Sequence, residues 1–213
     1  MITGIRALLV VAPHPDDETI AAHGLIAQCR RRGVAVRVLI VSDGAGSHRH
    51  SPRWPRDRLV RERRRETRMA MHRIGVAAGS ITVLDLPDGA VSAHVGTVRR
   101  AVSRALSALP KPVLALAPSP RDDHPDHRAV AAAARSEPGV RWCAYPVWPA
   151  GQRLHGARVM PLTAQQRLAK RHAIRRYRTQ TGRITDDPHG FALSTAQIAA
   201  FSRPYEILAS MRR

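Results

Sequence analysis

The chain has 213 residues, the size of a single domain that can bury a full core without disulfides or structural metals. Two cysteines are too few for a disulfide framework, and no apolar run reaches the roughly 18 residues of a membrane-spanning helix. The formal net charge is +19, nearly all from arginine, which could attract nucleic acid. Because aromatic residues make up only 4% of the chain, base-stacking platforms are not expected, and we interpret most arginines as lying on solvated helix faces.

Apolar runs of strand length alternate with segments of helical spacing. In chain order, the expected elements are strand 7–13, helix 17–32, strand 34–42, helix 57–74, strand and turn 80–89, helix 93–108, strand 112–120, helix 126–136, strand 141–148, strand 157–162, helix 163–179 and a short helix near 196–201. Continuous apolar strands followed by helices are typical of a parallel sheet that is covered on both faces.

These elements predict an α/β fold of the doubly wound, Rossmann-like kind, with a mostly parallel sheet and helices on both faces. No repeat or linker divides the chain, so we expect a single domain over residues 1–213. Its core is expected at about residues 7–180, followed by a C-terminal tail at residues 181–213.

Two of the predicted strands end in dense clusters of polar residues. The first is followed by "HPDDE" at 14–18 and the fourth by "RDDHPDHR" at 121–128. In open α/β sheets, ligands bind beyond the carboxyl ends of the strands, where the strand order reverses. If these two strands are neighbours, the two clusters meet in space.

The two clusters together contain a set of ligands for a divalent metal. His14 and Asp17 lie three residues apart at a strand-to-helix turn, and His127 opens the next helix. Two imidazoles and one carboxylate suit Zn²⁺ with an open position, and Fe²⁺ is also possible. Carboxylates at 16–18 could alternatively serve only to cap a helix, but two clusters at strand exits favour the metal site.

The motifs "APHPDDE" (12–18) and "HPDH" (124–127) resemble the two signature motifs of the PIG-L/LmbE-like family of zinc-dependent de-N-acetylases. The segments "RRRETRMAMHRIGV" (63–76), "LDLPDG" (84–89) and "AIRRYRTQ" (173–180) are also similar to segments of that family. The resemblance covers roughly residues 7–180.

The resemblance implies that the three ligands named above bind zinc and that Asp16 is the general base for a metal-activated water. It further implies that His124, when protonated, stabilises the oxyanion formed from an acetamide and passes a proton to the departing amine. Asp126 is expected to orient His124 and to raise its pKa. Glu18 has no implied ligand role, and we interpret it as a capping or supporting carboxylate.

The resemblance also matches Arg63 and Asp88 to positions that contact sugar hydroxyls in relatives. Arg63 could instead be one more arginine on a basic helix, and Asp88 could be a turn residue. Some relatives have a tyrosine where this chain has Asp122. The segment "PVWPAG" (146–151) could add an apolar wall to the pocket.

The loop 43–56 follows the second predicted strand and should border the mouth of the site. Its residues His48, His50 and Trp54 could line the substrate groove, or they could be ordinary surface residues.

The expected function is a metal-dependent hydrolase that removes an N-acetyl or N-acyl group from an amino sugar or sugar conjugate, such as one of N-acetylglucosamine, by attack of a zinc-activated water. One alternative is an N-deacylase of a small non-sugar amide. Another, from a different class, is a nucleic-acid-binding protein that retains the metal site, although a nucleic acid partner is not favoured. Without a signal-peptide pattern, the cytoplasm is the expected location, and the sequence does not predict the oligomeric state.

Overall fold

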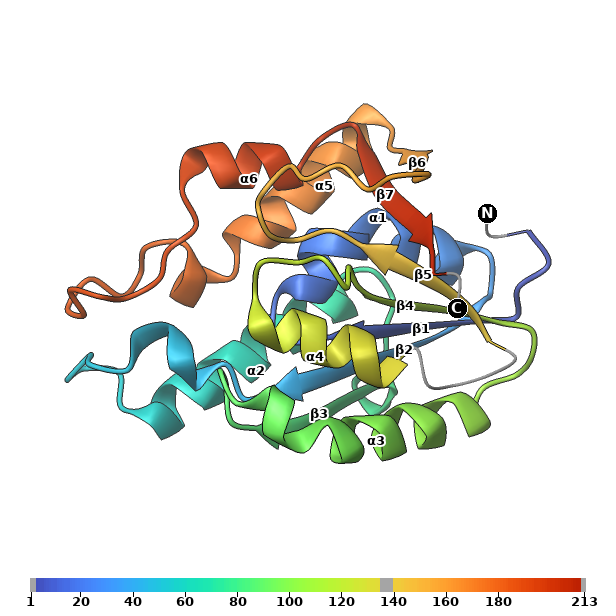
Figure 1. The fold of residues 1–213 in the computed structure, drawn as a ribbon. Helices are drawn as coiled ribbons and strands as arrows, with labels where there is room; N and C mark the ends of the chain where they lie inside the picture. Colours follow the sequence, from blue (N-terminus) through green and yellow to red (C-terminus); the bar gives the residue numbers. More distant parts are fainter. Residues whose placement is uncertain (1–2, 135–139, 212–213) are drawn as a thin grey trace.

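The computed structural model of the chain describes residues 3–134 and 140–211 (Figure 1). The strands are β1 (Ala7–Ala12), β2 (Ala35–Ser42), β3 (Ile81–Leu86), β4 (Val113–Pro118), β5 (Arg141–Tyr145), β6 (Arg158–Pro161) and β7 (Tyr205–Ser210). The α-helices are α1 (Asp17–Arg31), α2 (Arg56–His72), α3 (Val95–Ser107), α4 (Pro125–Ala134), α5 (Ala164–Arg175) and α6 (Thr195–Phe201). Short 3₁₀ turns occur at Ala45–His48, Ala78–Ser80, Val91–His94 and Arg178–Gln180.

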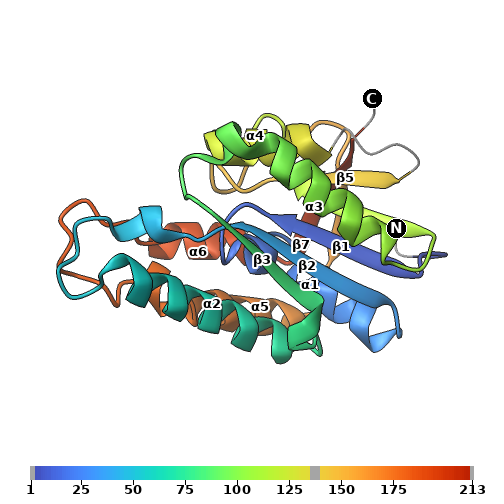
Figure 2. The ribbon, with the colours of Figure 1, turned by 90° about the horizontal axis from the view of Figure 1, so that it is seen from below.

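Within the described residues, the seven strands form one sheet in the order β3-β2-β1-β4-β5-β7-β6. The neighbours from β3 to β5 are parallel, whereas β7 runs antiparallel to both β5 and β6. Helices α3 and α4 cover one face of the sheet, and α1, α2 and α5 cover the other (Figures 1 and 2). The predicted doubly wound α/β fold is therefore confirmed, and the strand order reverses between β1 and β4, as the two polar clusters require.

The central strand β1 is apolar throughout because both of its faces are buried. Leu8 and Val10 pack into the core beneath α1, α2 and α5, and Leu9 and Val11 pack into the core beneath α3 and α4. Each of these four side chains is 0% exposed. Alternation of side chains along a strand thus supplies both cores from one short segment.

The segment 181–213, expected to be a tail, contributes to the sheet. The short helix near 196–201 is confirmed as α6, but the strand β7 was not expected. β7 lies between β5 and β6, so the C-terminal segment completes the sheet rather than trailing from it. Of the expected helix 126–136, residues 135–136 lie outside the described residues. Among the described residues, no helix has the length and apolar composition needed to cross a bilayer.

A glutamate in β7 stabilises a kink in α1. Ala22 has non-helical backbone angles (φ −139°, ψ 18°), which interrupts the helix. The backbone N–H groups of Gly24 and Leu25 donate to the Glu206 carboxylate, each at 2.9 Å. The Lys170 ammonium donates to the same carboxylate at 2.8 Å, and Lys170 and Glu206 are both buried. The kink therefore costs no unpaired N–H groups, because a buried and charge-balanced carboxylate accepts from them.

We expect Glu206→Ala to lower the free energy of unfolding by roughly 3–5 kcal/mol, because the Lys170 ammonium would remain buried without a counter-charge. The double variant Lys170→Met/Glu206→Ala removes that charge and should recover part of the loss. Urea denaturation of the three proteins measures both effects. Equal losses in the single and double variants would show that the buried charge pair is not the source of the destabilisation.

Candidate active site

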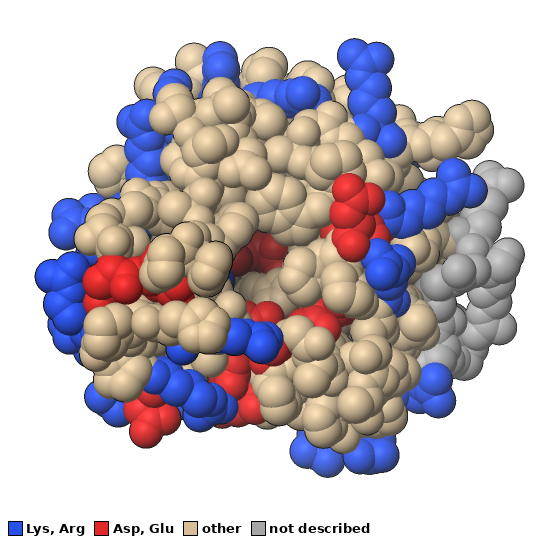
Figure 3. Space-filling view, turned by 60° about the vertical axis from the view of Figure 1, so that its left-hand side comes forward, with Lys and Arg blue, Asp and Glu red and all other residues tan. Residues whose placement is uncertain are grey.

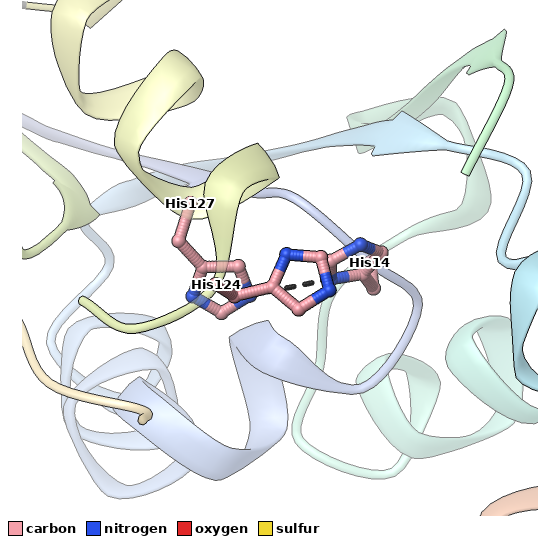
Figure 4. Close-up of side chains that lie close together, drawn as sticks. All are labelled: His14, His124 and His127. Atoms are coloured by element: carbon pink, nitrogen blue, oxygen red, sulfur yellow. Dashed lines mark hydrogen bonds between the residues drawn. The ribbon is translucent and has the colours of Figure 1, made fainter. Parts of the chain in front are cut away.

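The two polar clusters meet where β1 and β4 end side by side. His14 lies in the turn between β1 and α1, and His124 and His127 lie at the start of α4, which follows β4. The three imidazoles come together from these two segments (Figure 4). Their ring centroids are 4.6 Å apart for His14 and His124, 5.2 Å for His14 and His127, and 5.1 Å for His124 and His127.

The three predicted ligands place one atom each around a common point. His14 Nδ1 lies 3.3 Å from Asp17 Oδ2, Asp17 Oδ2 lies 3.3 Å from His127 Nε2, and His127 Nε2 lies 3.2 Å from His14 Nδ1. Metal–ligand bonds of about 2.0–2.2 Å at tetrahedral angles separate ligand atoms by roughly 3.3–3.5 Å. The residues therefore fit a divalent cation with an open fourth position. Two wider groups of described residues also bring possible ligand atoms within 4.8 Å of one another: His14/His124/His127 and His14/Asp88/Asp126.

The electrostatics of this triad favour the charged form of its carboxylate. Burial by itself would raise the pKa of Asp17, but the neighbouring His127 and His14 hold it well below its usual range. Asp17 is thus an anionic ligand, and a dication is a suitable partner for it.

Further carboxylates contact the outer nitrogen of each histidine ligand. His14 Nε2 lies 3.1 Å from Asp88 Oδ1 and 3.3 Å from Asp126 Oδ2. His127 Nδ1 lies 3.2 Å from Asp122 Oδ2. Such carboxylates orient a ligating imidazole and set which nitrogen carries the proton.

The expected orienting contact between the Asp126 carboxylate and His124 is not present among the described residues. The Asp126 carboxylate contacts His14 and accepts the backbone N–H groups of Gly89 (2.8 Å) and Val91 (3.1 Å). His124 instead accepts the backbone N–H of Asp126 at its Nδ1 atom, at 3.2 Å. Burial and the adjacent imidazoles lower the pKa of His124, and they outweigh the charges of Asp17 and Asp126, which raise it. The side chains of positions 124 and 126 leave the first turn of α4 in different directions, so sequence proximity does not make them partners.

Asp16 is held in a strained conformation beside the metal triad. Its φ angle is +131°, which non-glycine residues rarely adopt, and its side chain makes no helix-capping hydrogen bond in the described structure. Burial raises its pKa to about 8, the charges of Asp17 and Glu18 add to the rise, and Arg63 opposes it from 3.4 Å. Side-chain helix capping therefore does not explain the position of the Asp16 carboxylate.

Glu18 stabilises the turn between β1 and α1. Its carboxylate is fully buried, accepts the backbone N–H of Asp16 at 3.1 Å, and is hydrogen-bonded to the Tyr177 hydroxyl and to Thr19. Tyr177 follows α5, so Glu18 ties the start of α1 to the end of α5. This matches the interpretation of Glu18 as a supporting carboxylate.

Arg63 and Asp88 both line the cavity, and the backbone holds both in place. Arg63 donates to the carbonyls of Gly44 (2.8 Å) and Pro15 (2.6 Å), and it is 2% exposed, unlike the exposed Arg61 nearby on α2. It is therefore not simply another arginine on a basic helix. Asp88 accepts the N–H of Gly46 at 2.9 Å and contacts the ligand His14 as described above.

A cavity of about 610 Å³ opens over the metal triad. Figure 3 shows a hollow that contains acidic atoms, with arginine and lysine mainly around its outer edge. Besides the residues already described, its lining residues are Ile20, Gly46, Ser47, Arg49, Gly89, Asp123, Pro125, Trp148, Pro149, Ala150, Gln180, Phe191 and Gln197. The expected apolar wall from segment 146–151 is confirmed.

The loop 43–56 contributes Gly46, Ser47 and Arg49 to the cavity rather than the three candidates His48, His50 and Trp54. Phe191 and Gln197 were missed, because they lie in the expected tail and belong to no motif. Another cavity, of about 680 Å³, is lined mainly by α2 and α5 and contains none of the metal triad, so we place the active site at the smaller one.

The fold and the site together define a doubly wound α/β protein with a cluster of two histidines and one aspartate at its switch point that could hold a metal ion. A family model described as "PIG-L: GlcNAc-PI de-N-acetylase" matches residues 9–136, and the chain belongs to this family. No curated protein matches the sequence.

Solved structures share the fold at low identity. The N,N'-diacetylchitobiose deacetylase of Pyrococcus horikoshii is 20% identical, with a TM-score of 0.68 over 84% of this chain and 72% of that chain. The zinc-inhibited form of teicoplanin deacetylase Orf2 is 22% identical, with a TM-score of 0.67 over 82% and 85% of the two chains. GalB, a 4-carboxy-2-hydroxymuconate hydratase of Pseudomonas putida, is 18% identical, with a TM-score of 0.68 over 98% and 97%. The fold thus occurs in deacetylases and in a hydratase.

We expect the protein to bind one Zn²⁺ at the triad and Asp17→Ala to weaken that affinity by more than about 100-fold, since loss of a supporting contact alone costs 10–100-fold. Competition with a chromophoric chelator measures the affinity. Asp187→Ala is the matched control, because the Asp187 carboxylate accepts only the backbone N–H groups of His50 and His189. Equal zinc affinities in the two variants would place the metal elsewhere.

Zinc affinity should rise with pH. Burial would lower the pKa of His127, but Asp17 and Asp122 raise it to about 8, so below that pH the cation must displace a proton from the imidazole. Displacement of this one proton should therefore lower the affinity by up to about tenfold for each pH unit below pH 8. Chelator competition from about pH 6 to pH 8 tests this, and a flat profile would contradict it.

Proposed function

We propose that this protein is a metal-dependent hydrolase that removes an acetyl or related acyl group from the nitrogen of an amino sugar or sugar conjugate. Zn²⁺ is the favoured cation, with Fe²⁺ as the alternative. The observation that carries the proposal is the convergence of three ligand atoms, 3.2–3.3 Å apart, beside the strained carboxylate of Asp16 in an open cavity. Membership of a family described by de-N-acetylation supports the reaction type.

A cation bound at the triad would polarise the amide carbonyl and lower the pKa of a water molecule. Asp16 lines the cavity beside the triad, where its carboxylate would accept the proton of the attacking water. The carboxylic acid formed in this way would return the proton to the departing amine. One carboxylate can therefore serve both proton transfers.

His124 acts as a hydrogen-bond donor toward the substrate carbonyl. Because its Nδ1 atom accepts the backbone N–H of Asp126, the neutral ring carries its proton on Nε2. Burial lowers the pKa of His124 and keeps the ring neutral. A neutral Nε2–H stabilises a developing oxyanion without losing its proton. This replaces the protonated His124 expected at first.

The cavity suits a substrate with both an apolar face and hydroxyl groups. Trp148 and Phe191 supply the apolar side, and Gln180 and Gln197 supply amide groups that can donate and accept. We assign Arg63 and Asp88 to the hydroxyl-contacting side, as in the relatives that share these positions. An N-acetylglucosamine conjugate has these features.

The test is an assay for free amine with the zinc-loaded protein and a panel of N-acetylglucosamine, N,N'-diacetylchitobiose, larger conjugates and non-sugar N-acyl amines. Asp16→Asn should lower kcat by roughly 10²–10⁴-fold at unchanged zinc content, because the amide cannot accept the proton. Asp187→Asn is the control and should match the wild type. If the wild-type protein releases no amine from any compound, or if Asp16→Asn is as active as wild type, the proposal is refuted.

A further inference from the structure

We infer that Asp122 is a positioning residue that couples the metal ligand His127 to the wall of the cavity that carries Trp148. The resemblance to known motifs gave this position no role. The inference rests on the proposed metal centre but not on the proposed substrate, so zinc affinity tests it even if no N-acyl compound is hydrolysed.

The Asp122 carboxylate is 1% exposed and lies among four donors. Its Oδ1 atom accepts the backbone N–H of His124 at 3.0 Å. Its Oδ2 atom accepts the N–H groups of Trp148 at 2.9 Å and Val147 at 3.2 Å, and lies 3.2 Å from His127 Nδ1. A buried anion with this many donors has a single orientation, and that orientation fixes each of its neighbours.

The contact with His127 determines which ring nitrogen faces the cation. The imidazole is 0% exposed, and Asp122 Oδ2 lies 3.2 Å from its Nδ1 atom, which is paired with no other acceptor among the described residues. A carboxylate at this distance favours the tautomer with the proton on Nδ1, which leaves the Nε2 lone pair directed toward His14 and Asp17. Without the Asp122 carboxylate, the His127 imidazole could adopt the other tautomer or rotate.

The contacts with the segment after β5 place the aromatic wall. Trp148 packs edge-on against Phe191 and Phe201, with ring centroids 5.9 Å and 5.5 Å apart, and Trp148 and Phe191 both line the cavity. The backbone of Trp148 is anchored by the same oxygen that faces His127. One carboxylate therefore contacts both the proposed ligand His127 and the backbone of the aromatic wall.

The first experiment measures the zinc affinity of Asp122→Asn by chelator competition. In either orientation of the asparagine amide, its NH₂ group lies where a carboxylate oxygen of Asp122 accepted an N–H group. We therefore expect the zinc affinity to fall 10–100-fold. Asp187→Asn is the matched control, a buried carboxylate that accepts backbone N–H groups away from the triad, and it should match wild type. If Asp122→Asn loses thermal stability but keeps wild-type zinc affinity, Asp122 is only a loop anchor and the inference is overturned.

A second measurement needs only the wild-type protein, in case the variant does not fold. Long-range ¹⁵N–¹H NMR of the zinc-loaded protein should show His127 protonated at Nδ1 and metal-bound at Nε2. In the same spectra, the backbone amide of Trp148 should exchange slowly with solvent, and it should exchange faster in Asp122→Asn. A proton on Nε2 of His127, or unchanged Trp148 exchange in a folded variant, contradicts the coupling.

Discussion

The parallel pairing of β1 with β4 is the constraint on which the active site depends. Ala7 pairs with Val113 and Val10 with Leu116, so the two strands end at the same edge of the sheet. The metal triad takes His14 and Asp17 from one strand exit and His127 from the other. A shift of one residue in this register would turn every β1 side chain to the opposite face. The buried apolar pattern of the two strands therefore sets the positions of polar atoms that lie beyond it.

Charge balance is the second requirement of the site. Three adjacent acidic residues are buried at the start of α1, and different neighbouring groups stabilise each carboxyl group. Asp17 faces two imidazoles and stays ionised, Asp16 lies near Arg63 with a raised pKa, and Glu18 is hydrogen-bonded to Tyr177. Environment, rather than residue type, thus gives three similar carboxylates different charge states and contacts, in keeping with the proposed roles of ligand, proton acceptor and structural support.

The fold class and the meeting of the two polar clusters could be predicted because both rest on strong local signals. Continuous apolar strands indicate a sheet that is buried on both faces, and two polar motifs at the ends of strands indicate the point where the strand order reverses. β7 was missed because Glu206 interrupts its apolar pattern, and only the kink in α1 explains that residue. The contact of the Asp126 carboxylate with His14, and the positions of Phe191 and Gln197 in the cavity wall, depend on tertiary packing. The spacing of residues along the chain does not predict such contacts.

The support of α1 by Glu206 has a consequence for the order in which the molecule is completed. All three metal ligands, and Asp16 with them, have been synthesised once the ribosome has passed residue 127. At that stage the N–H groups of Gly24 and Leu25 have no acceptor, because Glu206 is still untranslated. A nascent chain thus contains the complete cation-binding set before its helix is secured and before the aromatic wall exists. The residues proposed to hold the cation are thus all present before the segment that completes the pocket.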